Sequence, residues 1–225
     1  MFKTVKKLAA AVISLTLLST GAFSAGIEGA PAPFGKKAVN IAVVSFLGSG
    51  DWLQAFEAGV KRQADTLGVK LTVSQARNDN DTQRNLVEQA INLGVDGIII
   101  NNGRPEVLKD VAQKALDKGI KVVAYDVDLE NPQIPQIEQS DRDMAKLVLD
   151  QAVKDKGDGF VGGAVYVAGF APLDRRYAVW KDVVAKHNLK EKAVWGAVND
   201  TVPASVADQT KAVLRANPDI SVIFT

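Results

Sequence analysis

Residues 95–126 read VDGIIINNGRPEVLKDVAQKALDKGIKVVAYD and hold the pattern that decides the fold. The runs at 95–100 and 120–125 are short, apolar and rich in β-branched residues, which is typical of strands buried on both faces. Between them, apolar residues recur at helical spacing from Pro105 until Gly119 provides a stop. A buried strand, a helix and a second buried strand in this order predict a β-α-β unit with parallel strands.

The same alternation of strand and helix extends from this unit toward both ends of the chain. Upstream, VNIAVVSF at 39–46 predicts another buried strand, and Trp52, Phe56 and Val60 begin a helical series that Gly68 ends. Strands alternating with helices of about 10 to 15 residues predict an α/β protein with a parallel sheet. Further strands are expected at 69–73, 164–168, 193–196 and 221–224, and further helices at 81–94, 141–152, 173–187 and 204–216.

Residues 1–25 have the composition of a secretory signal peptide. Three lysines in the first seven residues precede an apolar core at 8–18, and small residues follow at Ala22 and Ser24. The core is shorter than the ~20 residues of a membrane-spanning helix. We therefore expect cleavage after Ser24 or Ala25 and a soluble mature protein, the alternative being an uncleaved membrane anchor.

Cysteine content and net charge limit the cellular compartment and the class of binding partner that the sequence allows. The chain has no cysteine, so an exported form has neither disulfides nor the residue that carries a lipoprotein's lipid, which indicates a free periplasmic protein. The formal net charge is +1, and loss of the three leader lysines lowers it to about −2. A nearly neutral protein argues against nucleic acid and indicates a small uncharged ligand or another protein as the partner.

Candidate ligand-binding residues follow the predicted strands. In doubly wound sheets, ligands bind beyond the carboxyl ends of the strands, where side chains from several strands meet. Aromatic planes cover the apolar face of a sugar, while Asp, Asn and Arg hydrogen-bond its hydroxyls in pairs. No catalytic residue, cofactor or metal is expected. The candidates suit a sugar and are Asp51, Trp52, Asn101, Asp126, Arg176 and Thr201.

Several of these candidates also have a purely structural interpretation. Trp52 and Phe56 are four residues apart and therefore lie on the same face of the predicted helix. Trp52 is thus either the stacking aromatic or a core residue. Asp126 is otherwise a helix cap or a solvated turn acid. Asn101 and Asn102 precede a glycine, and turn chemistry accounts for at least one of them.

Two further polar clusters are interpreted as mainly structural. Arg175 and Arg176 are neighbours on one predicted helix and point in different directions, so at most one faces the ligand and the other is expected to be a surface charge. The run NDND at 78–81 resembles a calcium loop but lacks the spaced ligands and the closing glutamate. It predicts a solvated turn with Asp81 capping the next helix.

Four stretches occur together in a recognisable order: IAVVSF at 41–46 with its aromatic loop, GVDGIIINN at 94–102, GIKVVAYD at 119–126 and ANPDISVIF at 216–224. From Val39 onward the chain resembles the periplasmic sugar-binding proteins of ABC transporters, in particular the ribose and galactose group. The resemblance implies two doubly wound parallel-sheet lobes with a three-strand hinge, which close over a monosaccharide and present it to an inner-membrane permease.

The resemblance also implies how the chain divides after its leader. An N-terminal lobe is expected at 36–139 and a C-terminal lobe at 140–225. The last residues, Ser221–Thr225, read as a strand that nothing follows and covers. We therefore expect an amino-terminal fragment with an incomplete second lobe, the alternative being a lobe that is incomplete in nature.

Residue by residue, the resemblance assigns roles to four candidates. Trp52 matches the stacking aromatic, Asn101 the amide at the end of the third strand, and Asp126 the aspartate that binds sugar hydroxyls. Arg176, four residues before Trp180, matches the arginine of an R-x-x-x-aromatic helix start.

Two positions depart from the ribose pattern. Thr201 stands where ribose binders usually have an aromatic residue, and Val127 stands where they have an arginine. The resemblance therefore leaves the sugar and its ring form open.

Other functions have weaker support in the sequence. An enzyme would need a motif such as G-x-G-x-x-G, but Gly48-Ser49-Gly50 is followed by DWL, and neither a P-loop nor a G-x-S-x-G elbow is present. The pair Asp126 and Asp128 leaves an exported glycoside-processing enzyme as one alternative. A ligand-loaded partner of a chemoreceptor is the other. In either binding role a monomer is expected.

Overall fold

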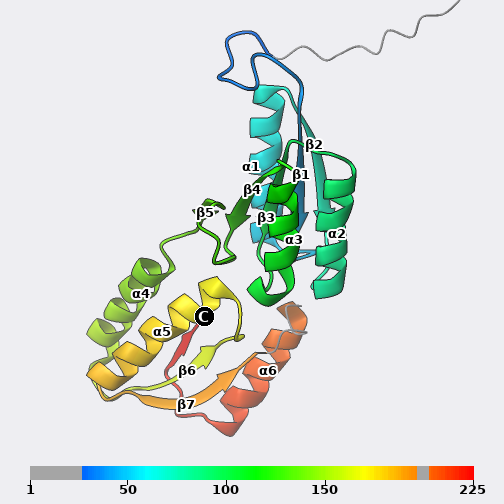
Figure 1. Ribbon diagram of the computed structural model, residues 1–225. Coiled ribbons are helices and arrows are strands. Elements are labelled where there is room, and N and C mark those ends of the chain that lie inside the picture. The colour runs from blue at the N-terminus through cyan, green and yellow to red at the C-terminus, as the bar shows by residue number, and fades with distance from the viewer. Residues whose placement is uncertain (1–26, 197–202) are drawn as a thin grey trace, which may run out of the picture.

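The computed structural model describes residues 27–196 and 203–225, so the predicted leader and Thr201 lie outside the described residues. Two α/β bodies lie end to end, each built on its own parallel sheet, as Figure 1 shows. The predicted α/β class with parallel sheets is therefore confirmed. In the described ranges no helix has the length and apolar character needed to cross a membrane.

The first sheet has five strands, all parallel. Apolar side chains fill its centre: Val43 and Val44 of the first strand are 1% exposed, and Ile100 of the third is 0% exposed. In spatial order the strands are β2 (Val69–Gln75), β1 (Val39–Ser45), β3 (Gly97–Asn101), β4 (Lys121–Tyr125) and the two-residue β5 (Gln136–Ile137), which the sequence did not predict.

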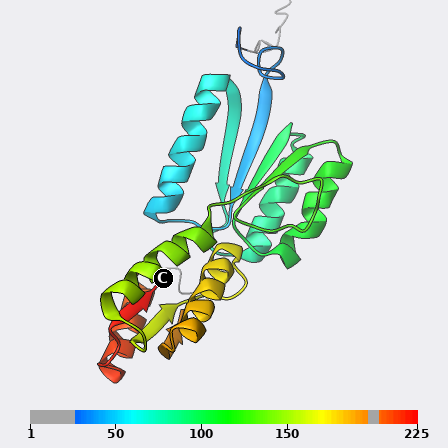
Figure 2. The same ribbon diagram turned by 90° about the vertical axis from the view of Figure 1, so that its left-hand side faces the viewer.

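Helices cover this sheet on both faces. Figure 2 shows α1 (Asp51–Leu67) on one face and α2 (Asn80–Asn92) with α3 (Pro105–Asp117) on the other. The predicted turn before α2 is present, but the cap is Asp79 and not Asp81, because the Asp79 carboxylate accepts a hydrogen bond from the Thr82 amide at 2.6 Å. Hydrogen bonding from the Thr82 side chain, together with the bond from its amide, lowers the pKa of Asp79.

The second sheet has three parallel strands in the order β7 (Lys190–Trp195), β6 (Val161–Val165) and β8 (Val222–Phe224). Its helices are α4 (Asp141–Lys156), α5 (Ala171–Lys186) and α6 (Pro203–Ala216), and α4 packs against α5. The strand ends at Ile137 and the helix start at Asp141 bracket the predicted lobe boundary at 139/140, which stays a prediction.

The prediction for β6 was wrong by three residues, because the strand begins at Val161 and not at Ala164. Gly162 and Gly163 disfavour a strand by themselves, yet large rings on both faces require them. A Cβ added to Gly162 would lie 2.6 Å from Cη2 of Trp180, and one added to Gly163 would lie 2.6 Å from Cζ3 of Trp195.

Gly162→Ala is expected to destabilise the protein, because the Trp180 ring that blocks the new methyl group is fully buried and rigid. Overpacking of this kind costs about 1–3 kcal/mol. The melting temperature should fall by about 2–10 °C. Gly59→Ala, in an open position on α1, is the control and should leave the melting temperature unchanged or higher. Equal melting of Gly162→Ala and wild type would contradict this packing.

The α4 helix presents apolar side chains outward. The sequence predicts one apolar face of Met144, Leu147, Val148 and Ala152. The first three side chains are 40%, 74% and 55% exposed, and Ala152 is partly buried against the core. Ala145 and Leu149 face the core instead, at 2% and 1% exposed. The helical period was correct, whereas which face turns inward depends on tertiary contacts at the start of the helix.

Candidate functional site

The strand order of each sheet creates a crevice at its carboxyl edge. Strand β1 lies between β2 and β3, and β6 lies between β7 and β8, so the strand order reverses beside β1 and beside β6. Each reversal is a topological switch point. A cavity of about 340 Å³ is formed by residues from both bodies. Its lining consists of Leu47, Trp52, Asn102, Asp126, Gln139, Val167, Phe170, Pro172, Leu173 and Arg176.

Asp126 follows β4 and brings a carboxylate into this cavity. The residue is 2% exposed and has a left-handed backbone with φ 53°, which aspartate tolerates better than most residues. Within the described chain its Oδ1 has no hydrogen-bond partner, while Oδ2 accepts a long bond of 3.5 Å from Gln139 Nε2. Burial raises the pKa of Asp126, and Asp141 adds to this, whereas Arg175 and Gln139 act in the opposite direction.

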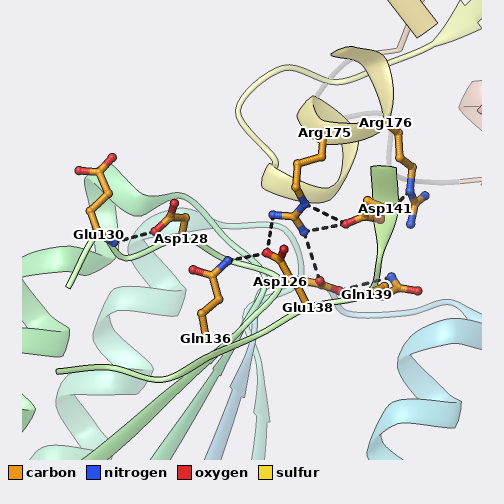
Figure 3. Close-up of polar contacts among 9 residues, drawn as sticks. All are labelled: Asp126, Asp128, Glu130, Gln136, Glu138, Gln139, Asp141, Arg175 and Arg176. Atoms are coloured by element: carbon orange, nitrogen blue, oxygen red, sulfur yellow. Dashed lines mark hydrogen bonds and ion pairs between the residues drawn. The ribbon is translucent and has the colours of Figure 1, made fainter. Parts of the chain in front are cut away.

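A buried ion-pair cluster next to the cavity joins the two bodies, as Figure 3 shows. Asp141, at the start of α4, accepts bonds from Arg175 Nη2 at 2.6 Å and from Arg176 Nε at 2.8 Å. Arg175 also lies 2.9 Å from Glu138 and 3.6 Å from the Oδ1 of Asp126. The cluster therefore connects the end of β4, the linking segment and the two helices α4 and α5.

The two arginines differ from the sequence-based expectation in one respect. Arg176 lines the cavity, as expected for the arginine that faces the ligand. Arg175 was expected at the surface, but its side chain is only 14% exposed and lies within reach of three carboxylates. Arg175 pairs with the buried carboxylate of Asp141, and each charge compensates the other away from water.

The asparagine in the lining is Asn102, one residue later than the predicted Asn101. Asn101 is 0% exposed, and its Nδ2 donates to Ser45 Oγ at 3.0 Å, so it fastens β3 to β1 outside the cavity lining. Asn102 has φ 54° and is 9% exposed, and its Oδ1 has no hydrogen-bond partner in the described chain. Gln83 holds the turn by donating to the Asn102 carbonyl at 3.0 Å.

Trp52 packs against its neighbours without being a buried core residue, and its role as the stacking aromatic stays a prediction. Its ring stacks on Phe56 at 5.6 Å between centroids and lies 5.9 Å from Tyr125. At 36% exposed it also keeps a free part of its surface and lines the cavity. The neighbouring Asp51 is exposed and lies outside the lining.

The wall contributed by the second body consists of Val167, Phe170, Pro172 and Leu173. Phe170 was expected beyond the end of a strand, whereas Val167, Pro172 and Leu173 were not predicted from the sequence as site residues. The loop before α5 is held by Asp174, which accepts from Tyr166 Oη at 2.6 Å and from the Gly169 amide at 3.2 Å. Burial and the bond to Asp174 raise the pKa of Tyr166 to about 12.

A second set of contacts joins the two bodies at Phe170. Arg104, at the start of α3, donates to the Ala168 carbonyl at 3.3 Å, and its guanidinium lies 5.3 Å from the centroid of the Phe170 ring. On the same ring, Phe46 lies at 5.3 Å between centroids. These contacts fix Phe170 in place as part of the cavity wall.

Comparisons with known proteins place this geometry in context. The family model described as the periplasmic binding protein domain matches residues 41–225. The D-xylose-binding periplasmic protein of Haemophilus influenzae is 32% identical over 119 residues, which is 51% of this chain and 35% of that protein. Its Escherichia coli counterpart is 40% identical over 65 residues, 29% of this chain and 20% of that protein.

Among solved structures, the 5-methylthioribose transporter solute binding protein from Thermotoga lettingae TMO superimposes with a TM-score of 0.79 and 33% identity. The match covers 82% of this chain and 58% of that one. A sugar ABC transporter protein from Yersinia enterocolitica gives a TM-score of 0.78 and 28% identity, over 84% and 58%. The chain therefore spans well under two thirds of the length of these relatives.

Proposed function

The chain belongs to the periplasmic binding protein family, and from this premise we propose that it is the sugar-binding component of an ABC transporter. It holds a monosaccharide in the cavity between its two lobes and delivers it to a membrane permease. The names of the relatives, which refer to D-xylose and 5-methylthioribose, support a pentose or a close derivative as the ligand.

One observation carries the proposal: two buried oxygen acceptors in the cavity lining receive no hydrogen bond within the described residues, and one of them, Asp126 Oδ1, has only an ion-pair contact of 3.6 Å to Arg175. The Oδ1 atoms of Asp126 and Asn102 have no hydrogen-bond partner in the described chain. A buried acceptor without a donor costs about 1–3 kcal/mol. Sugar hydroxyls supply the missing donors, so binding removes this cost, while the exposed part of Trp52 covers the apolar face of the ring.

The arrangement supports capture by closure. Asp126, Asn102 and Trp52 come from the N-terminal lobe, Arg176 comes from the C-terminal lobe, and Gln139 lies in the segment between them. A ligand that bonds to both lobes at once favours the closed form over the open form by its differential affinity. The permease then recognises the closed surface.

Other parts of the proposal extend beyond the cavity. Asp51 and Thr201 remain predicted ligand contacts, although Asp51 is exposed outside the cavity lining and Thr201 lies outside the described residues. Residues 1–25 are proposed to direct export to the periplasm, where the protein acts as a monomer and can also dock with a chemoreceptor. A binding role without catalysis is favoured because the cavity lining within the described residues holds one carboxylate, whereas glycoside hydrolysis uses two.

The proposal is tested by thermal melts of the purified chain with and without millimolar aldoses. A ligand at 100 times its dissociation constant adds about 2.7 kcal/mol of stability. We expect at least one sugar to raise the melting temperature by about 5–10 °C. A cooperative melt that no sugar changes would contradict the assignment.

Intrinsic fluorescence should report binding through Trp52. Trp52 is 36% exposed and lines the cavity, whereas Trp180 is 0% and Trp195 is 7% exposed and neither lines it. We expect a saturable change in emission with the bound sugar that disappears in Trp52→Phe. Trp195→Phe is the control and should keep the change. Loss of the signal in the control alone would show that the ligand contacts a different tryptophan.

A further inference from the structure

The cavity lining is divided into a polar part and an apolar part. The polar groups are Asp126, Gln139, Arg176 and Asn102. The larger part consists of side chains that can neither donate nor accept a hydrogen bond: Leu47, Val167, Phe170, Pro172 and Leu173.

Three of these polar groups, Asp126, Gln139 and Arg176, gather where the two lobes are linked. Gln139 donates to Asp126 at 3.5 Å, and Arg176 bonds at 2.8 Å to Asp141, which also binds Arg175 beside Asp126. These side chains therefore form one connected group along the linking segment, as Figure 3 shows. A ligand must direct its hydroxyls toward this group.

The apolar part is a preformed wall around Phe170. The Phe170 ring contacts Phe46, the residue before Leu47, so both lobes contribute to one apolar surface. Arg104 fixes this surface from behind through its bond to Ala168 and its position over the Phe170 ring. Because the wall is held by contacts outside the cavity, it cannot easily rearrange to offer polar groups.

Such a wall discriminates against a sugar that carries hydroxyls on every carbon. A hydroxyl placed against it loses its bonds to water and gains none in return. An alkyl group in the same place loses nothing and buries apolar surface. Val127, at the position where the ribose pattern has an arginine, is 0% exposed in the core and adds no polar group to compensate.

We propose that the preferred ligand is a monosaccharide in which one exocyclic hydroxyl is absent or replaced by an alkyl or alkylthio group, and that this group lies against Leu173 and Phe170. The inference rests on the proposed function and names the substrate class of the same site. A single apolar group in a hydrophobic pocket changes affinity by about 10- to 200-fold.

Titration calorimetry on matched sugar pairs tests this inference. The pairs are D-ribose with 5-methylthio-D-ribose, D-ribose with 5-deoxy-D-ribose, and D-galactose with 6-deoxy-D-galactose, the last of which preserves the pyranose ring. We expect at least one derivative to bind at least tenfold more tightly than its parent.

A variant pair locates the effect on the wall. Leu173→Asn is expected to reduce the preference for the derivative at least fivefold. Leu147→Asn, the same exchange on α4 at a side chain 74% exposed and outside the cavity lining, should leave the preference unchanged.

Each result leads to a different conclusion. Parent sugars that bind as tightly as their derivatives, or more tightly, would overturn this inference and leave the proposed function in place. An unchanged preference in Leu173→Asn would overturn the assignment of the wall. A cooperatively melting protein that binds neither parents nor derivatives would overturn the proposed function, and this inference with it.

Discussion

Asp126→Asn is expected to lower the affinity for the bound sugar at least 100-fold while leaving the protein as stable as before, or more stable. The affinity falls because asparagine replaces one of the two acceptor oxygens with an NH2 donor. It also removes the charge, and bonds to a charged group are worth about 1.5–3 kcal/mol each. A loss of about 3 kcal/mol corresponds to roughly a 150-fold weaker dissociation constant.

The stability should not fall, because the pKa of Asp126 is raised in the folded protein by burial and by Asp141. A raised carboxyl pKa means that the folded state favours the proton. The stability contributed by this group is complete below pH 3.8 and is lost as the pH rises through the folded pKa. At neutral pH the buried charge is therefore a cost, which asparagine removes. Arg175 keeps its ion pairs with Asp141 and Glu138.

Calorimetry for affinity and urea unfolding at pH 7 and pH 4 for stability would check both parts. The advantage of the variant in stability should be largest at pH 7 and should shrink at pH 4, where the wild-type carboxyl takes up its proton. Asp128→Asn, at an exposed residue two positions later, is the control and should change neither quantity. Wild-type affinity in Asp126→Asn would exclude Asp126 as a ligand contact.

Asp141→Asn is expected to have the largest effect on stability. The Asp141 side chain is 0% exposed and receives three hydrogen bonds from Arg175 and Arg176. Removing one partner of a buried ion pair costs about 3–5 kcal/mol. Here Arg176 loses the carboxylate that it bonds, whereas Arg175 keeps its contacts to Glu138 and Asp126. The melting temperature should fall by about 6–20 °C.

The same exchange at Asp143, an exposed acid in the first turn of the same helix, provides the matched control. Its contact to Ser140 lies at the surface, so we expect a change of no more than a few degrees. Calorimetric melts of the two variants at neutral pH make the comparison. Asp141→Asn should also weaken sugar binding, because Arg176 loses the carboxylate that orients it toward the cavity. Similar melts for Asp141→Asn and Asp143→Asn would contradict a structural role for the buried cluster.

The sequence predicts the elements of the first lobe well, since its strands are dense apolar runs and its helices begin and end at recognisable residues. It fails at β6, where Gly162 and Gly163 conceal a strand whose glycines are required by tryptophans distant in the sequence. Local propensity reports only the residue itself. The rings that fill the space beside it come from α5 and β7.

The candidate site was predictable in its chemistry but not in its details. Asp126 and Arg176 reach the cavity as expected, because the carboxyl ends of strands and the starts of helices meet there. The asparagine that lines the cavity is Asn102 and not the predicted Asn101. Asn101 ends β3 and donates to Ser45, whereas Asn102 follows the strand with a left-handed backbone. Apart from Phe170, the apolar wall gave no signal, since residues such as Leu173 look alike in a core and in a cavity.

The contact between Arg104 and the loop carrying Phe170 allows the sensitivity and the selectivity of ligand binding to be set by different residues. It joins the lobes through protein groups alone. In the proposed capture by closure, it would contribute the same free energy to the closed state whichever ligand is present. A uniform bias of this kind multiplies all apparent association constants by one factor and cancels from their ratios. Sensitivity can therefore be tuned at this arginine, on the outer side of the wall, while selectivity is set by the side chains that face the ligand.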